Sequence, residues 1–191
     1  CQKKAQENSM LKHRKIFVLV VILIAIIGAK EFVYHVSFPA VYKDYIVKYS
    51  EEYDIDPYLL LAVINVESRF DKDATSHKGA IGLMQLTEST AHWIAESTGD
   101  ENFDTDDLYD PETNIKMGAW YIDNIRKEFG STELVLAAYN AGRGNVAGWI
   151  NSEVIGRDGT DCKNIPYDET KRYVEKVMRN QDIYRVLYDI S

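Results

Sequence analysis

The chain of 191 residues, 46% hydrophobic and 27% charged, has room for one ordinary globular domain and a short additional segment. Its 22 basic and 30 acidic residues give a net charge of −8, and such a surface repels phosphate backbones, so we expect no nucleic-acid partner. Two distant cysteines, Cys1 and Cys162, and four scattered histidines give neither a disulfide framework nor metal-ligand spacing, and we expect no metal or other cofactor.

The first break in composition is an uninterrupted apolar run at residues 16–29. Basic residues precede the run, which predicts that residues 1–15 stay in the cytoplasm and that everything after the run lies outside. About 14 residues are short for a full span, but apolar side chains continue beyond the run. We therefore expect residues 16–36 to form an uncleaved, single-pass anchor in the cell membrane. A cleaved signal segment, which would release a secreted protein, is the alternative.

From residue 39 onward the apolar residues recur at helical spacing, so the sequence predicts a predominantly α domain over 39–191. Helix starts and stops are indicated by capping residues, first-turn prolines and glycines. These signals are Asp56-Pro57, Thr87, Gly99, Asp110-Pro111, Gly130, Ser131 and Gly142. The first helix is expected to place on one face Val41, Tyr45, Ile46 and Tyr53.

Helical periodicity is lost over residues 75–86. The run from Gly79 to Leu86 is too apolar for a solvated loop and too rich in glycine for a stable helix. A short strand or a tight buried turn fits this composition better. The acidic stretch at 100–110 predicts a solvated loop; a calcium loop is the alternative, although no glycine stands at the sharp turn that such a loop needs.

One acidic residue falls on an apolar helix face. At 100° per residue, Glu67 lies between Leu60 and Val63 on the helix expected from Asp56 to Phe70. Loss of hydration disfavours the charged form of a carboxyl and raises its pKa, so Glu67 could hold and donate a proton near neutral pH. A helix-end glutamate that turns to solvent or pairs with Arg69 is the alternative interpretation.

Four motifs occur along the chain, and they are Glu67-Ser68, the run from Gly79 to Gln85, Ala138-Tyr139-Asn140 with Ala141-Gly142, and Glu169 to Val174. In order and rough spacing they resemble the catalytic domain of soluble lytic transglycosylases, a lysozyme-like family related to goose-type lysozyme. The resemblance covers Tyr42 to Tyr188. It implies an α+β lysozyme-like fold, in which a single helical domain holds a deep sugar-binding cleft and a short irregular or β segment occupies residues 75–86.

The resemblance also implies an activity. Such enzymes cleave the β-1,4 bond between N-acetylmuramic acid and N-acetylglucosamine in peptidoglycan, and the muramyl 6-hydroxyl displaces the leaving sugar to form a 1,6-anhydro end. By similarity, Glu67 is the single general acid and base. Ordinary glycoside hydrolases need two carboxylates; the nearest others, Asp71 and Asp73, follow the helix in a polar stretch. A hydroxyl already on the substrate is then a reasonable nucleophile.

The remaining motif residues are expected to bind substrate. Amide groups suit the neutral sugar substituents, and tyrosines offer a ring to the sugar and a hydroxyl to Glu67 or the substrate. By similarity, the substrate-binding residues are Ser68, Met84, Gln85, Tyr139, Asn140 and Tyr173. Cleft packing is an alternative for Met84, a helix-cap role for Asn140, and a plain helix-end position for Ser68.

Two further functions remain open at the level of sequence. One is a hydrolytic muramidase that uses water on the same fold, and the other is a non-catalytic peptidoglycan-binding scaffold within an envelope machine. The expected partners are peptidoglycan glycan strands and, through residues 16–36, the cytoplasmic membrane; envelope-complex proteins are further candidates. We expect the protein to be a monomer.

Overall fold

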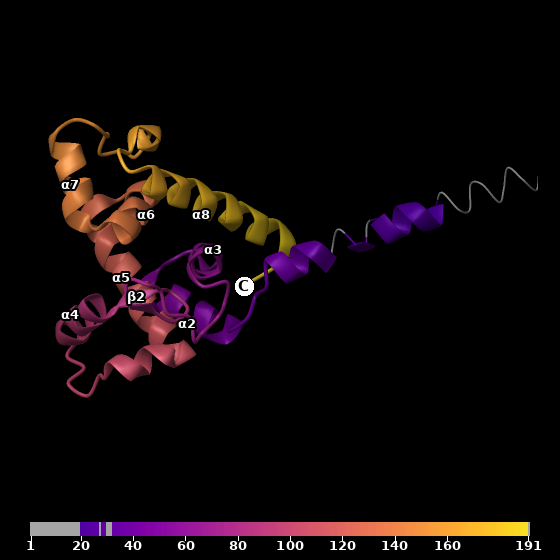
Figure 1. The fold of residues 1–191 in the computed structure, drawn as a ribbon, viewed down its shortest axis with the longest axis horizontal. Coiled ribbons are helices and arrows are strands. Elements are labelled where there is room, and N and C mark those ends of the chain that lie inside the picture. The colour runs from indigo at the N-terminus through magenta and orange to yellow at the C-terminus, as the bar shows by residue number, and fades with distance from the viewer. Residues whose placement is uncertain (1–19, 27, 30–31, 191) are drawn as a thin grey trace, which may run out of the picture. The chain divides into compact units, whose positions relative to one another are not determined.

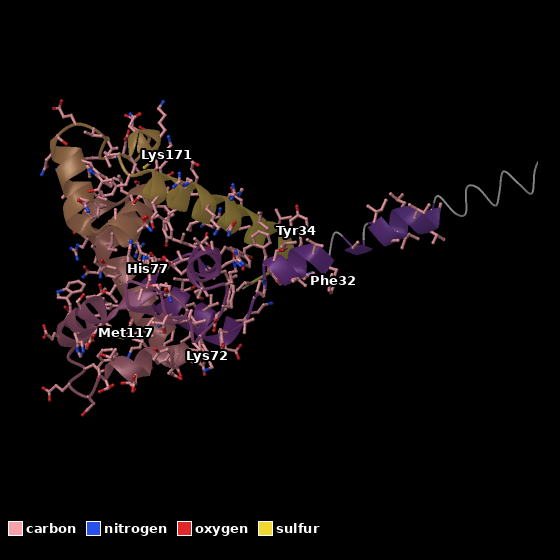
Figure 2. All side chains as sticks on the ribbon, in the orientation of Figure 1. Phe32, Tyr34, Lys72, His77, Met117 and Lys171 are labelled. Atoms are coloured by element: carbon pink, nitrogen blue, oxygen red, sulfur yellow. The ribbon has the colours of Figure 1, made fainter. Side chains whose placement is uncertain are left out.

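The computed structural model describes residues 20–26, 28–29 and 32–190, and the chain divides into two compact units, Cys1–Pro39 and Ala40–Ser191 (Figure 1). Nearly all described residues of the first unit up to residue 37 are helical, and Figure 2 labels Phe32 and Tyr34 on this segment. Within the described ranges, no helix is both long enough and apolar enough to cross a membrane. The predicted segment 1–15 and the start of the predicted anchor lie outside the described residues.

The second unit is built almost entirely of helices, which confirms the predominantly α fold class (Figure 1). Its helices are α2 (Lys43–Tyr53), α3 (Pro57–Glu67), α4 (Glu88–Thr98), α5 (Pro111–Phe129), α6 (Thr132–Ala141), α7 (Arg143–Asn151) and α8 (Asp168–Leu187). Two short 3-10 helices are η1 (Thr105–Tyr109) and η2 (Cys162–Asn164).

Helix α3 lies in the core of this unit, and α8 packs along it. Every residue from Leu59 to Asn65 is buried. Across the α3–α8 contact, Asn180 Nδ2 donates to Asn65 Oδ1 over 2.9 Å, and Gln181 Nε2 donates to Asp56 Oδ2 over 2.9 Å. Because a buried polar group left without its partner costs about 1–3 kcal/mol, these bonds fix the register of α8 on α3.

The helix caps largely follow the sequence. The side chains that accept a first-turn backbone N–H are Asp56, Thr87, Asp110 and Ser131. Gly99 ends α4 in the left-handed conformation, with φ 75° and ψ 24°. Gly142 ends α6 as expected and has a positive φ of 90°, but its ψ of 144° is not that of the left-handed conformation, because α7 begins at the next residue.

Two expected helix limits are wrong. Val41 precedes α2 and is 43% exposed, since Tyr42 has a φ of 60° and starts the helix only at Lys43. Helix α3 ends at Glu67 and not at Phe70, because Arg69 and Phe70 have φ values of 54° and 66°. A positive φ cannot continue a right-handed helix.

The segment without helical periodicity forms a small antiparallel hairpin, as expected. Strand β1 (Ala80–Ile81) pairs with β2 (Leu86–Thr87). Gly82, between the strands, has a φ of 76°, and a β-carbon there would lie 2.3 Å from Asn114 Nδ2. The Asn114 amide donates to Ile81 O over 3.1 Å and accepts from Met84 N over 2.8 Å. The glycine therefore lets a buried asparagine of α5 hold the hairpin loop.

The acidic stretch before α5 is used for capping. Asp104 accepts from the backbone N–H of Asp106, Asp107 accepts from that of Asp104, and Asp110 caps α5. Among the described residues, no group of three or more histidines, cysteines or acids is placed to hold a metal ion. In the observed contacts, these carboxylates accept hydrogen bonds from backbone N–H groups.

Candidate active site

Glu67 is the last residue of α3, at the end of the buried part of that helix. Tyr173, which is 8% exposed on α8, donates its hydroxyl to Glu67 Oε1 over 2.7 Å. The salt bridges of the described residues do not include Glu67, so the alternative pairing with Arg69 is not formed. The carboxyl group is held by a neutral hydroxyl and not by a cation.

Burial raises the pKa of Glu67 to about 7, while the hydroxyl of Tyr173 and the positive charge of Lys176 act in the opposite direction. The position at the end of α3 adds to the effect of burial, because the last carbonyl groups of a helix carry partial negative charge. A carboxyl group with this pKa exchanges its proton near neutral pH. It can therefore act first as a general acid and then as a general base.

Two tyrosines surround this carboxyl group. Burial and the charge of Glu67 raise the pKa of both Tyr139 and Tyr173 well above the usual value, so both phenols keep their protons. Tyr139, on α6, donates its hydroxyl to the backbone carbonyl of Met84 over 2.6 Å. The expected neighbours Glu67, Tyr139 and Tyr173 are thus brought together from α3, α6 and α8.

The hairpin loop contributes Met84 and Gln85. Met84 is completely buried, and a β-carbon on Gly118 of α5 would lie 2.2 Å from its sulfur, so its side chain packs the wall and has no surface for a ligand. Gln85 has a φ of 48°, and its Nε2 donates to Ala74 O over 3.2 Å and to Gly82 O over 3.0 Å. These two bonds from the amide nitrogen of Gln85 hold the loop.

Ser68 and Asn140 also have structural partners. Ser68 is the C-cap of α3, and its hydroxyl donates to Ile64 O over 3.3 Å. Asn140 Oδ1 accepts from the Thr170 hydroxyl over 2.8 Å, which ties the end of α6 to α8. The amide nitrogen of Asn140 remains a donor that a sugar could use. Substrate binding by Ser68, Gln85, Tyr139, Asn140 and Tyr173 stays a prediction.

The nearest other carboxylates have different partners. Asp71 and Asp73 are exposed in the turn after α3. Asp71 Oδ1 accepts the backbone N–H of Asp73 over 3.0 Å, and Asp73 pairs with Lys72 over 2.7 Å. These contacts are the loop and capping roles that a polar turn predicts. Glu67 differs from them because burial holds its proton near neutral pH.

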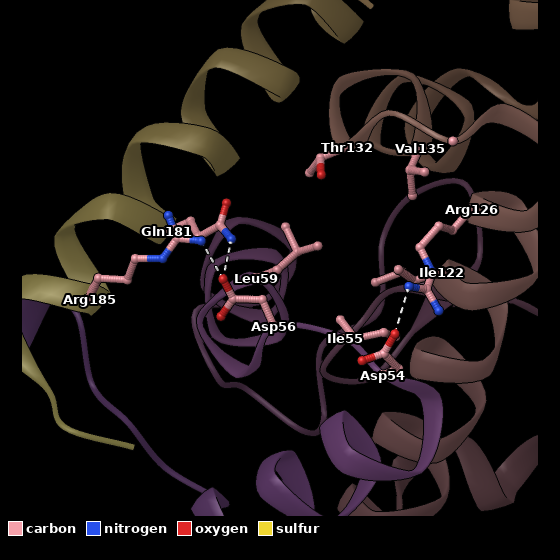
Figure 3. A pocket seen from close by; sticks show the side chains of 11 residues that line it. Asp54, Ile55, Asp56, Leu59, Ile122, Arg126, Thr132, Val135, Gln181 and Arg185 are labelled. Atoms are coloured by element: carbon pink, nitrogen blue, oxygen red, sulfur yellow. Dashed lines mark hydrogen bonds and ion pairs between the residues drawn. The ribbon is translucent and has the colours of Figure 1, made fainter. Parts of the chain in front are cut away.

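A hollow of about 210 Å³ borders the other end of α3 (Figure 3). Its carboxylates face cations and amides: Asp54 pairs with Arg126 over 3.3 Å, and Asp56 binds both Gln181 and Arg185. Both carboxylates have a cationic partner, whereas the side-chain partner of Glu67 is the neutral Tyr173 hydroxyl. The candidate active site is therefore the Glu67 end.

The transglycosylase SLT domain family matches residues 44–158, which include Glu67, Gln85 and Asn140. The chain belongs to this family. The matched range ends before α8, so the place of Tyr173 in the site rests on its bond to Glu67.

Relatives of this SLT domain include soluble and membrane-bound proteins. The soluble lytic murein transglycosylase of Salmonella typhimurium is 32% identical over 151 residues, 78% of this chain and 23% of that protein. The membrane-bound lytic murein transglycosylase C of Edwardsiella ictaluri is 30% identical over 175 residues, 75% of this chain and 46% of that protein. The chain thus spans less than half of either relative.

Solved structures support the same fold. The 70 kDa soluble lytic transglycosylase of Escherichia coli superposes with a TM-score of 0.72 at 32% identity, covering 78% of this chain and 25% of that one. An inactive mutant of the lytic transglycosylase Slt of Pseudomonas aeruginosa gives a TM-score of 0.71 at 31% identity, covering 78% and 25%. The expected lysozyme-like fold class is confirmed by these structures.

Sequence reasoning missed several residues that build the site. Asn114 is fully buried and holds the hairpin loop, Thr170 bonds Asn140, and Lys176 lowers the pKa of Glu67. Asn114 carried a signal, since it is a polar residue beside the apolar face of the predicted helix from Pro111. Thr170 stands in the motif from Glu169 to Val174, but its bond to Asn140 exists only where α8 meets α6, and nothing local in the sequence marks Lys176.

Proposed function

We propose that this SLT domain is a peptidoglycan lytic transglycosylase that cleaves the bond between N-acetylmuramic acid and N-acetylglucosamine and leaves 1,6-anhydromuramyl ends. Glu67 is its single general acid and base. The observation that carries the proposal is a carboxyl group with a pKa of about 7, held by the Tyr173 hydroxyl, while the nearby Asp71 and Asp73 are exposed and engaged in turn contacts.

The proposed reaction needs one group to act twice. Glu67 first gives its proton to the glycosidic oxygen, and the bond from this oxygen to the muramyl C1 breaks. The muramyl 6-hydroxyl oxygen then bonds to C1 and loses its proton to Glu67, which restores the starting state. The Tyr173 hydroxyl, which donates to Oε1, stabilises the ionised carboxylate between the two steps. No water is consumed.

The experiment is mass spectrometry of the fragments that the purified chain releases from peptidoglycan, with Glu67→Gln as control. Glutamine keeps the size of the side chain and an oxygen for Tyr173 but carries no exchangeable acidic proton. We expect anhydromuramyl ends from the parent chain and a loss of about a thousandfold or more in the mutant, because acid–base catalysis alone contributes about 10²–10⁴-fold.

The rival functions predict other products. A hydrolytic muramidase would give reducing muramyl ends with water added, and it would require a second carboxylate about 5–9.5 Å from Glu67. A non-catalytic scaffold would bind peptidoglycan without releasing fragments, and a cell carrying Glu67→Gln would keep the function of its envelope machine. Either result would overturn the proposal.

The proposed place of action is the outer face of the cytoplasmic membrane, with the N-terminal unit as anchor. Its described residues expose many apolar side chains, including Val20, Ile22, Leu23, Ile24, Phe32 and Val36. A relative named as membrane-bound supports this placement. The test is fractionation of cells. Ile22→Lys with Ile24→Lys should move the protein from the membrane to the soluble fraction, and Glu52→Lys, at an exposed position of α2, should not.

A further inference from the structure

A hollow of about 250 Å³ lies at the turn between α2 and α3, beside the first turn of α3. One face of α2 and its C-cap form a wall, because Val47, Ser50, Glu51 and Asp54 recur at helical spacing and all line the hollow. Pockets for drug-sized ligands measure about 300–1,000 Å³, so this hollow has room for one side chain. Glu67 ends α3 about 15 Å further along the helix axis, at 1.5 Å per residue, so the hollow is separate from the candidate active site.

The turn and the segment after α8 supply an apolar wall. Its lining residues are Ile55, Pro57 and Ile190. The Tyr58 hydroxyl donates to Tyr188 O over 3.0 Å and accepts from Ile190 N over 3.1 Å. These two bonds hold the segment after α8 against the start of α3, so the apolar wall is fixed by the fold.

Ser50 adds a polar group that has no partner. The residue is 4% exposed, and its hydroxyl oxygen is buried without a hydrogen bond from any of the described residues. A serine within a helix can bond the carbonyl oxygen four residues earlier, but Ser50 does not. A buried hydroxyl without a hydrogen bond is unfavourable, so a polar atom bound in the hollow would supply the partner that the fold lacks.

The rim of the hollow is acidic. Glu51 and Asp54 are exposed, and none of the described residues that line the hollow is basic. Asp54 pairs with Arg126 over 3.3 Å, whereas the salt bridges of the described residues do not include Glu51. The net charge of −8 attracts cations to such a surface. The hollow thus combines an apolar wall, a hydroxyl and a carboxylate without a counter-ion.

We propose that this hollow is a docking site for a lysine side chain of a partner protein. Lysine buries its aliphatic stem on apolar surface while its charged head meets polar groups. The stem packs on Ile55 and Ile190. The ammonium group, which has three donors, binds the Glu51 carboxylate and the Ser50 hydroxyl. This inference does not rest on the proposed function.

The neighbouring surface favours a polypeptide as the source of the lysine. Asp54 and Ile55 line both this hollow and the hollow of about 210 Å³ drawn in Figure 3. The latter has apolar lining residues of its own, which are Leu59, Ile122 and Val135. The surface therefore extends beyond one side chain, as a segment of a partner would require. The peptide stems of peptidoglycan carry carboxylates beside their amines, and the acidic rim would repel them.

The test measures binding of dye-labelled, end-blocked hexapeptides to the full chain in detergent micelles by fluorescence anisotropy. The three probes differ at one position, which holds lysine, acetyl-lysine or norleucine, so the last two keep the aliphatic stem without the charge. We expect the lysine peptide to bind at least tenfold more tightly than the others, and added salt to reduce the difference because the rim is exposed. Equal affinity of the three peptides would overturn the proposal.

Glu51→Gln should weaken binding of the lysine peptide about threefold to tenfold and leave the norleucine peptide unchanged. The matched control is Glu52→Gln, which removes the same charge from the next exposed residue of α2, outside the lining of the hollow. Equal weakening by both variants would indicate only the general attraction of an acidic surface and would overturn the site. Glu51-dependent binding of soluble peptidoglycan fragments that was tighter than that of the lysine peptide would identify the wall as occupant and overturn the partner protein.

Ser50→Ala tests the buried hydroxyl. Because this hydroxyl has no partner in the free protein, we expect the variant to unfold at the same temperature as the parent or higher, while binding of the lysine peptide weakens about threefold. A serine with a purely structural role would give the opposite pattern, with lower thermal stability and unchanged binding, and that result would remove Ser50 from the site.

Discussion

The two ends of α3 place carboxylates in opposite environments. At the first turn, Asp56 accepts the backbone N–H of Tyr58 over 2.9 Å and is bound by Gln181 and Arg185 (Figure 3). At the last turn, Glu67 has one neutral partner, Tyr173, and burial raises its pKa to about 7. The helix dipole reinforces the contrast, because it favours negative charge at the first turn and disfavours it at the last.

The contrast shows how one helix can serve both stability and chemistry. The contacts of Asp56 cap the first turn of α3 and join α3 to α8. Those of Glu67 leave the charged form poorly compensated, so that the protein keeps a proton near neutral pH at a cost in folding free energy. The following predictions separate these two roles.

The largest effect concerns the stability cost at Glu67. In the unfolded chain its pKa is near 4.5, and in the folded protein it is about 7. The folded state thus keeps a proton that the unfolded state has lost, and folding is penalised increasingly as pH rises from 4.5 to 7. Glu67→Gln removes this penalty, and we expect its free energy of unfolding to exceed that of the parent by about 3 kcal/mol at pH 8 but hardly at pH 4.5.

Urea unfolding at these two pH values measures the difference. Glu112→Gln is the control with the opposite sign, because hydrogen bonds from Lys48 and Tyr49 lower the pKa of Glu112. The Glu112 carboxylate stabilises the folded protein at pH values above the usual pKa of a glutamate, and this stabilisation disappears as pH falls. Stabilisation by Glu67→Gln that did not depend on pH would contradict the buried, protonated carboxyl group.

At the other end of the helix, Asp56→Ala should lower the free energy of unfolding by about 1–2 kcal/mol, the usual cost of losing a helix N-cap. The alkaline limb of the pH profile of activity should stay in place, because Asp56 acts on the opposite end of α3. The free energy of unfolding at pH 7 measures the loss of stability, and the pH dependence of activity shows whether the alkaline limb stays in place. Movement of the alkaline limb would show that the two ends are coupled.

Tyr173→Phe should raise the pKa of Glu67. The hydroxyl lowers the pKa of Glu67, so its removal raises that pKa. A hydrogen bond to a charged group contributes about 1.5–3 kcal/mol, which predicts an alkaline limb shifted upward by roughly one pH unit or more. The pH dependence of kcat/KM measures the shift, with Tyr167→Phe, exposed at the start of α8, as control. An unmoved limb would show that Tyr173 does not hold the carboxyl group proposed to be catalytic.

The smallest effect is expected at Lys176, whose exposed charge lowers the pKa of Glu67 from a distance. Lys176→Met should raise the alkaline limb by a few tenths of a pH unit at low salt, and added salt should abolish the shift because exposed charges are screened. Lys171→Met, on the same helix (Figure 2), tests for a general effect of lost charge. A shift that persisted in salt would point to a direct contact.

The sequence by itself determined the features that depend on neighbouring residues. Caps such as Asp56 and Ser131 bond N–H groups two or three residues away, and helical periodicity placed Glu67 at an apolar face. Even there the local signal had a limit, because it extended α3 to Phe70 although two positive φ values end the helix at Glu67. Those backbone conformations form the turn that follows α3, which helical periodicity does not mark.

The tertiary structure decided what Glu67 touches. Tyr173 is 106 residues away in the chain, and its hydroxyl reaches Oε1 only because amide bonds such as Asn65 to Asn180 set the register of α8 on α3. The burial that raises the pKa of Glu67 likewise depends on the packing of several helices. The ring contacts from Tyr139 through Tyr121 to Trp93 also join separate helices. Local hydrogen bonding and periodicity encode each helix, whereas contacts between helices depend on packing that no single stretch of sequence contains.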